Sequence, residues 1–168
     1  MYATATAPPP RARIKDTLET RFTVAHDSWM SDADRFLLPV ANSDATFWER
    51  WAALRYVQEH LLERYRLERM LLEEIRGFLM PEMRERLWMQ ADRLTRLLAE
   101  FDRLARQRES ARQLARTTRE LMEALRLWYA EIEFGTSGVQ RDDLSGEGVR
   151  LLAELNSAGR CGWADANS

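Results

Sequence analysis

The chain has 168 residues, of which 45% are hydrophobic and 31% charged, and its formal net charge is −2. This mixture is typical of a soluble helical protein and excludes a disordered chain. The near-neutral charge gives the whole molecule no bias toward nucleic acid or an anionic membrane, and the single cysteine, Cys161, excludes an intrachain disulfide.

Residues 1–13 are predicted to form a flexible tail, because the three consecutive prolines at 8–10 cannot start a helix. This start lacks the charged beginning and apolar core of a signal peptide, and no apolar run approaches the ~20 residues that span a bilayer. We therefore expect a cytoplasmic protein without a membrane span. Residues 14–158 are predicted to form one helical domain, and residues 159–168 a second flexible tail.

Two short helices are expected in the first part of the domain. Residues 14–24 fit a short amphipathic helix. Ser31 fits the N-cap of a second helix that carries Phe36 and Leu37, and Pro39 is expected to end or kink it.

From Thr46 to Phe134 the sequence contains only one glycine, Gly77, and one proline, Pro81. This scarcity predicts long helices folded back at a single turn. Thr46 and Glu49 fit a capping box at the start of the first helix. Apolar residues then recur at steps of three and four, which predicts one buried face. That face consists of Phe47, Trp51, Leu54, Leu61, Tyr65, Leu72, Ile75 and Leu79.

Charged residues four apart on this first helix are expected to pair on its outer faces. The pairs are Arg55 with Glu59, Arg64 with Glu68, and Arg69 with Glu73.

The second long segment runs from Pro81 to Phe134, yet its apolar stripe changes side. At about 100° per residue, the stripe through Leu94 and the stripe through Leu125 lie roughly half a turn apart. A break near residues 108–110, where Ser110 and Gln113 offer a second capping box, gives a three-helix bundle. One continuous helix of about 80 Å gives an antiparallel, coiled-coil-like hairpin. Both architectures are all-α with short flanking helices, and both remain open at this stage.

A continuous second helix has a consequence for assembly, because the first helix can cover only one of its two apolar stripes. The other stripe then predicts at least a dimer, with Leu121, Leu125 and Trp128 in or near the interface. After Phe134, a glycine-containing loop ends the helix, and Ser145 is expected to cap a last short helix.

Four arginines of the second segment, Arg108, Arg112, Arg116 and Arg119, lie within a quarter-turn of one another if the helix is continuous. Such a stripe fits a phosphate backbone or an acidic protein partner. The alternative is a solvated face balanced by acids on neighbouring helices, which is the interpretation we favour.

No catalytic, metal-binding or nucleotide-binding motif stands out, and no cofactor is predicted. His26 and His60 are too few for a metal site. The sequence therefore favours a non-enzymatic interaction protein, an adaptor or structural subunit that self-associates. A nucleic-acid-associated or regulatory protein using the arginine stripe is the first alternative. A small-ligand sensor with an apolar pocket between helices is the second.

Overall fold

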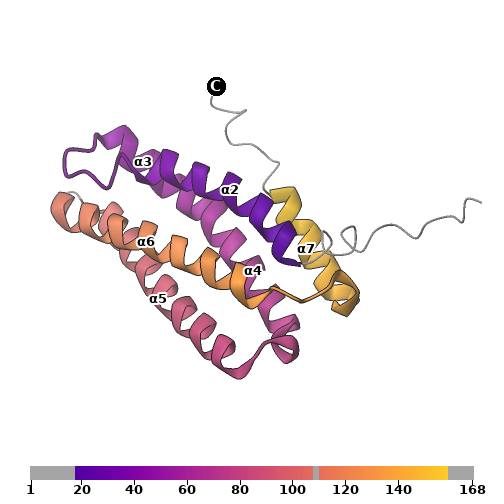
Figure 1. Cartoon of the computed structure of the whole chain (residues 1–168). Helices are drawn as coiled ribbons and strands as arrows, with labels where there is room; N and C mark the ends of the chain where they lie inside the picture. Colours follow the sequence, from indigo (N-terminus) through magenta and orange to yellow (C-terminus); the bar gives the residue numbers. More distant parts are fainter. Residues whose placement is uncertain (1–17, 108–109, 159–168) are drawn as a thin grey trace, which may run out of the picture.

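The computed structural model describes residues 18–107 and 110–158 (Figure 1). All regular elements in these ranges are helical, which confirms the all-α prediction. The expected tails at 1–13 and 159–168 lie outside the described residues, as does the start of the helix expected at 14–24. The elements, in chain order, are α2 (Leu18–Leu37), α3 (Phe47–Tyr56), the π-helical turn η1 (Val57–Leu61), α4 (Leu62–Glu74), the 3-10 turn η2 (Arg76–Phe78), α5 (Pro81–Ala105), α6 (Ala111–Gly135), the 3-10 turn η3 (Arg141–Asp143) and α7 (Gly146–Ala158).

The first described helix differs from the two short helices that were expected. α2 is one helix of 20 residues, and Ser31 lies inside it rather than at an N-cap. Its continuity has a simple cause: Trp29, Ala33 and Leu37 recur every four residues, and all three are buried in the core. α2 ends at Leu37, two residues before Pro39, in agreement with the expected stop.

α3, η1 and α4 follow one another without a loop, and they form the helix predicted from Thr46 onward. The Thr46 hydroxyl accepts a hydrogen bond from the backbone N–H of Glu49 at 3.2 Å, which confirms the predicted cap. The turn after α4 contains Gly77, and Pro81 is the first residue of α5, as the sequence predicts.

The second long segment is broken into α5 and α6, each of 25 residues, so the single 80 Å helix is wrong. The two helices fold back on each other and pack along their length (Figure 1). The predicted capping box at Ser110 does not form. The Ser110 hydroxyl donates to the side-chain oxygen of Gln107 at 3.3 Å, and no side-chain cap bond is made to α6.

The core lies where α2, α4, α5, α6 and α7 meet. α6 packs against α5 and α2, and α7 packs against α4 (Figure 1). The break before α6 lets both apolar stripes of the second segment turn inward, because α6 reverses direction relative to α5. The largest fully buried side chains are Trp29, Leu37, Leu61, Leu71, Ile75, Leu87, Leu94, Phe101, Leu104 and Trp128.

Within the described ranges, no helix combines the length and the apolar character needed to cross a membrane.

Candidate functional site

α3 carries a solvent-exposed aromatic face. Phe47 is 68% exposed, Trp48 73% and Trp51 45%. The sequence had placed Phe47 and Trp51 on the buried face of the helix, and that placement is wrong. The buried residues of α3 are instead Ala53 and Tyr56.

The π-helical turn η1 gives the physical reason for this correction. A π turn holds about one residue more than an α turn, so it offsets the faces on its two sides by roughly a quarter of a turn. A stripe extrapolated backward from Leu61 and Tyr65 at regular α spacing therefore misses the true buried face of α3. Since insertions of this kind occur often at functional sites, the α3 face is a candidate site.

A groove adjoins the exposed aromatic face and separates α3 from the C-terminal end of α5. Its volume is about 120 Å³. We call it the α3–α5 groove, and its lining consists of Phe47, Arg50, Trp51, Leu54, Ala105, Arg106 and Gln107.

Two polar contacts hold α3 and η1 against α5 and so fix the groove. The Arg50 guanidinium donates to the backbone carbonyl of Gln107 at 2.6 Å and approaches that of Leu104 at 3.5 Å. This places a cation on the C-terminal carbonyls of α5, where the helix dipole favours it. The Gln58 amide donates to Asp102 at 2.9 Å, and Asp102 also accepts from Arg106. The groove is thus a fixed feature with charged walls.

A second unusual feature is a charged pair inside the core. Arg64 is 5% exposed and Glu68 1% exposed, and Arg64 Nε lies 3.4 Å from Glu68 Oε1. The indole N–H of Trp128 donates to the other carboxylate oxygen at 2.5 Å, and Arg64 donates to the hydroxyl of Tyr129. The sequence had placed this pair on an outer face of the helix, which is wrong.

Aromatic rings surround this charged pair. We call the whole set the buried polar cluster, and it consists of Trp29, Tyr56, Arg64, Glu68, Trp128 and Tyr129. The Arg64 guanidinium carbon lies 4.7 Å from the ring centroid of Trp29 and 5.5 Å from that of Tyr129, within the range of cation–π attraction. Tyr56, also buried, packs its ring on Phe36 with the centroids 4.9 Å apart. The cluster therefore joins α2, α3, α4 and α6 at one point.

Burial sets the protonation behaviour of this cluster. It raises the pKa of Glu68 to about 7, against the opposing attraction of Arg64 and the hydrogen bond from Trp128. It also raises the pKa of the Tyr56 and Tyr129 hydroxyls, so both stay protonated near neutral pH.

The predicted arginine stripe is only partly assembled. Arg108 lies outside the described residues. Arg112 and Arg116 are exposed, and Arg116 pairs with Glu120 at 3.4 Å. Arg119 donates to the backbone carbonyl of Ala41 at 2.8 Å, which ties α6 to the turn that follows α2. Arg119 thus has a structural contact, and Arg112 is the one described member of the stripe for which the structure records no such partner.

The three predicted interface residues, Leu121, Leu125 and Trp128, are fully buried between helices of the same chain. In this fold they offer no surface to a second copy. The reason for expecting them in an interface was an unbroken second helix, and the break between α5 and α6 removes it.

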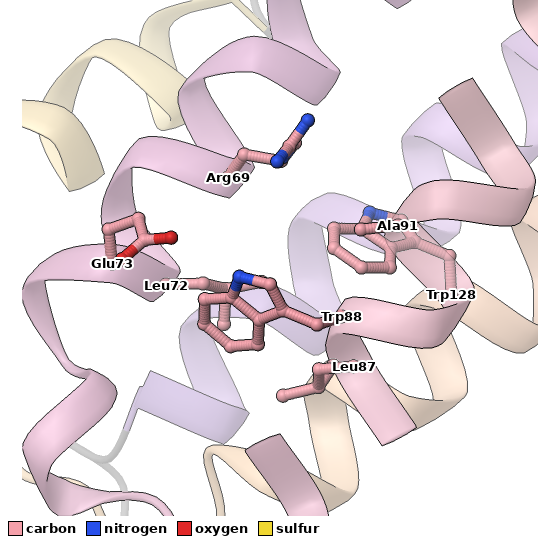
Figure 2. Close-up of a pocket in the computed structure, with 7 residues that line it drawn as sticks. All are labelled: Arg69, Leu72, Glu73, Leu87, Trp88, Ala91 and Trp128. Carbon is pink, nitrogen blue, oxygen red and sulfur yellow. The ribbon is translucent and has the colours of Figure 1, made fainter. Parts of the chain in front are cut away.

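The structure also offers a small cavity between α4 and α5, which is the kind of site a ligand sensor would need. Figure 2 shows its lining, with the Trp88 ring lying between Leu72 and Leu87 and with Arg69 and Glu73 at its edge. Its volume of about 10 Å³ admits at most one water molecule. A wider hollow of about 340 Å³ beside Trp88 is open to solvent, and charged side chains line part of it. Neither resembles the apolar pockets that small ligands occupy.

In the part of the chain that the structure describes, no three His, Cys, Asp or Glu side chains are grouped so that they could hold a metal ion. Comparison of the chain with protein-family models, with curated proteins and with solved structures finds no match. The function is therefore argued from the residues of the chain itself.

Sequence reasoning missed the buried ion pair, although a signal for it existed. For the aromatic residues of α3 it favoured core packing over the alternative, an exposed anchor for a partner or a membrane interface. Arg64 lies three residues after Leu61, and Glu68 lies three residues after Tyr65 and four before Leu72. Leu61, Tyr65 and Leu72 all belong to the face predicted to be buried. That spacing could have identified a buried ion pair. The π turn has no comparable signal, because no glycine or proline marks it.

Proposed function

We propose that this chain is a non-enzymatic interaction protein, an adaptor or a structural subunit of a larger assembly. The observation that carries the proposal is the exposed aromatic face formed by Phe47, Trp48 and Trp51. Large aromatic side chains gathered on a surface are typical of protein contact sites, where they supply most of the binding energy. They are not needed for the core, which Trp29 and Trp128 fill from other helices.

The alternative functions have weaker support. Binding of nucleic acid would depend on Arg112 and Arg116, because Arg119 is engaged with the turn that follows α2. Arg116 already faces Glu120, which lowers the attraction for a phosphate backbone. A small-ligand sensor would need a larger enclosed pocket than the cavity at Trp88.

A displayed library of short random peptides tests the proposed function. The full chain is immobilised, and the same selection is run in parallel on a Trp48→Ser/Trp51→Ser variant. We expect wild type to enrich peptides that the variant does not retain, because the anchoring rings are gone. Equal enrichment on both chains would show that the aromatic face is not a contact site. Sedimentation velocity of the two chains tests whether a second copy occupies the face instead.

Retention on a nucleic-acid column tests the alternative function, binding of nucleic acid. Retention that falls steeply with salt and disappears in an Arg112→Glu/Arg116→Glu variant would favour the nucleic-acid function. We expect weak retention that these two substitutions leave unchanged.

A further inference from the structure

The α3–α5 groove has the size and shape to accept one side chain of a partner. Its volume of about 120 Å³ compares with about 30 Å³ for one water in the liquid, and with about 300–1,000 Å³ for pockets that bind drug-sized molecules. Phe47, Trp51 and Leu54 follow each other at helical spacing and form one apolar wall, while Ala105 leaves the opposite wall low. The groove therefore fits a single apolar anchor residue.

The charge of the lining is one-sided. Arg50 and Arg106 line the groove, and none of the described residues that line it carries a carboxylate. Arg106 is partly neutralised by Asp102 at 3.0 Å. Arg50 has no acidic partner among the described residues. Its hydrogen bonds run from one terminal nitrogen to backbone carbonyls, which leaves its Nε and its other terminal nitrogen as donors for an external group.

We infer that the α3–α5 groove docks an acidic amphipathic segment of another protein. An apolar side chain of that segment lies between Phe47, Trp51 and Ala105, and a carboxylate beside it pairs with Arg50. This inference rests on the proposed function and names the partner's chemistry. Arginine suits the role because its planar guanidinium is already oriented by the α5 carbonyls, so a carboxylate gains directed hydrogen bonds without ordering the side chain.

The same charges argue against a second copy as the occupant. A symmetric contact between two copies places the same patch on both sides, so Arg50 and Arg106 of each chain would meet those of the other. Without a carboxylate in the lining, this contact brings like charges together, which disfavours it. An anionic lipid surface would complement the positive charges of Arg50 and Arg106. It would not fill the α3–α5 groove, because a bilayer presents no protruding side chain.

The test uses the full chain and the displayed-peptide selection. Two results are determined: the amino-acid composition of the enriched peptides, and the residues of the chain to which they bind. We expect the enriched peptides to combine an apolar or aromatic residue with Asp or Glu. Synthetic versions should bind Arg50→Gln and Trp51→Ser variants at least about tenfold more weakly than wild type. Matched controls at the opposite end of α5, Arg84→Gln and Phe78→Ser, should leave the affinity unchanged.

Folding of each variant is checked by its melting temperature, because Arg50 also contacts the end of α5. Trp51→Ser removes only an exposed ring, so it keeps the test valid if Arg50→Gln unfolds. Binding of synthetic peptides should also weaken as salt is raised, since an ion pair contributes to it.

Three results would overturn the inference. Peptides that enrich without acidic residues, or that bind the Arg50→Gln and Trp51→Ser variants as tightly as wild type, show another docking site while leaving the proposed function intact. Vesicles of anionic lipid that sediment with wild type but not with these variants show a membrane partner. A failure to enrich any peptide, together with a chain that stays monomeric, contradicts the proposed function as well.

Discussion

Arginine lies over tryptophan at three places among the described residues, and two of these places differ sharply in what surrounds them. In the core, Arg64 lies over Trp29 at 4.7 Å, with a carboxylate and a tyrosine hydroxyl beside it. On the surface, Arg55 lies over Trp51 at 4.8 Å, and solvent reaches both. A buried cation must find its partners within the protein, whereas water serves an exposed one. Arg55 also pairs with Glu59 at 3.2 Å, so it is the exposed Trp51 ring that remains available for binding on the surface.

The largest effect should come from breaking the buried pair. Arg64→Met leaves the Glu68 carboxyl in the core without its cation, and we expect a loss of about 3–5 kcal/mol in the free energy of unfolding at pH 8. Adding Glu68→Leu to the same chain should recover most of that loss, because no buried charge remains. Urea unfolding measures both. An exposed pair on the same helix, Glu63 with Arg66 at 2.6 Å, is the control, and Glu63→Ala should change stability by less than about 0.5 kcal/mol.

The apolar part of the core should respond nearly as strongly. Leu61 and Leu94 are both 0% exposed, and replacing either by alanine should cost about 2–5 kcal/mol through lost contacts and a residual cavity. The shift of the urea midpoint reports it. If these variants unfold no more easily than Glu63→Ala, the burial of Leu61 and Leu94 in the core is wrong.

Stability should also depend on pH through Glu68. Its pKa is about 7 in the fold against 4.5 when unfolded, so the folded chain binds the proton more tightly. The stabilisation is complete below about pH 4.5 and is lost as the pH rises through about 7, with a total of about 3 kcal/mol. Urea unfolding between pH 5 and pH 8 should show the decline in wild type.

A matched pair of variants isolates that effect. His60 titrates in the same window with the opposite sign, because burial lowers its pKa and stability then falls as the pH drops. Both chains therefore carry His60→Gln, and one of them also carries Glu68→Gln. The decline from pH 5 to pH 8 should be present in the first and absent in the second. An identical decline in both would assign it to other groups.

The smallest effect should come from the exposed face. Phe47→Ser and Trp48→Ser remove rings that are more than two-thirds exposed, so each should change the free energy of unfolding by less than about 0.5 kcal/mol. A loss comparable to that of Leu61→Ala would mean that these rings belong to the core of the folded chain.

Much of the fold follows from local rules, and its deviations have local causes. The cap at Thr46, the start of α5 at Pro81 and the helical class could all be predicted, because each depends on residues adjacent in sequence. The break before Ser110 was one of two alternatives, since no glycine or proline marks it. The exposed face of α3 was the less favoured interpretation of its aromatic residues, because the π turn that rotates this face leaves no compositional trace.

The central claim is that binding and folding depend on separate regions of the chain. It is tested most directly by measuring, in Trp51→Ser and in Arg64→Met, both the free energy of unfolding and the affinity for an acidic peptide selected on wild type. The account predicts that Trp51→Ser binds at least about tenfold more weakly with unchanged stability. It predicts that Arg64→Met loses stability while its folded fraction binds as wild type does. Binding that is lost in Arg64→Met and retained in Trp51→Ser would contradict the account.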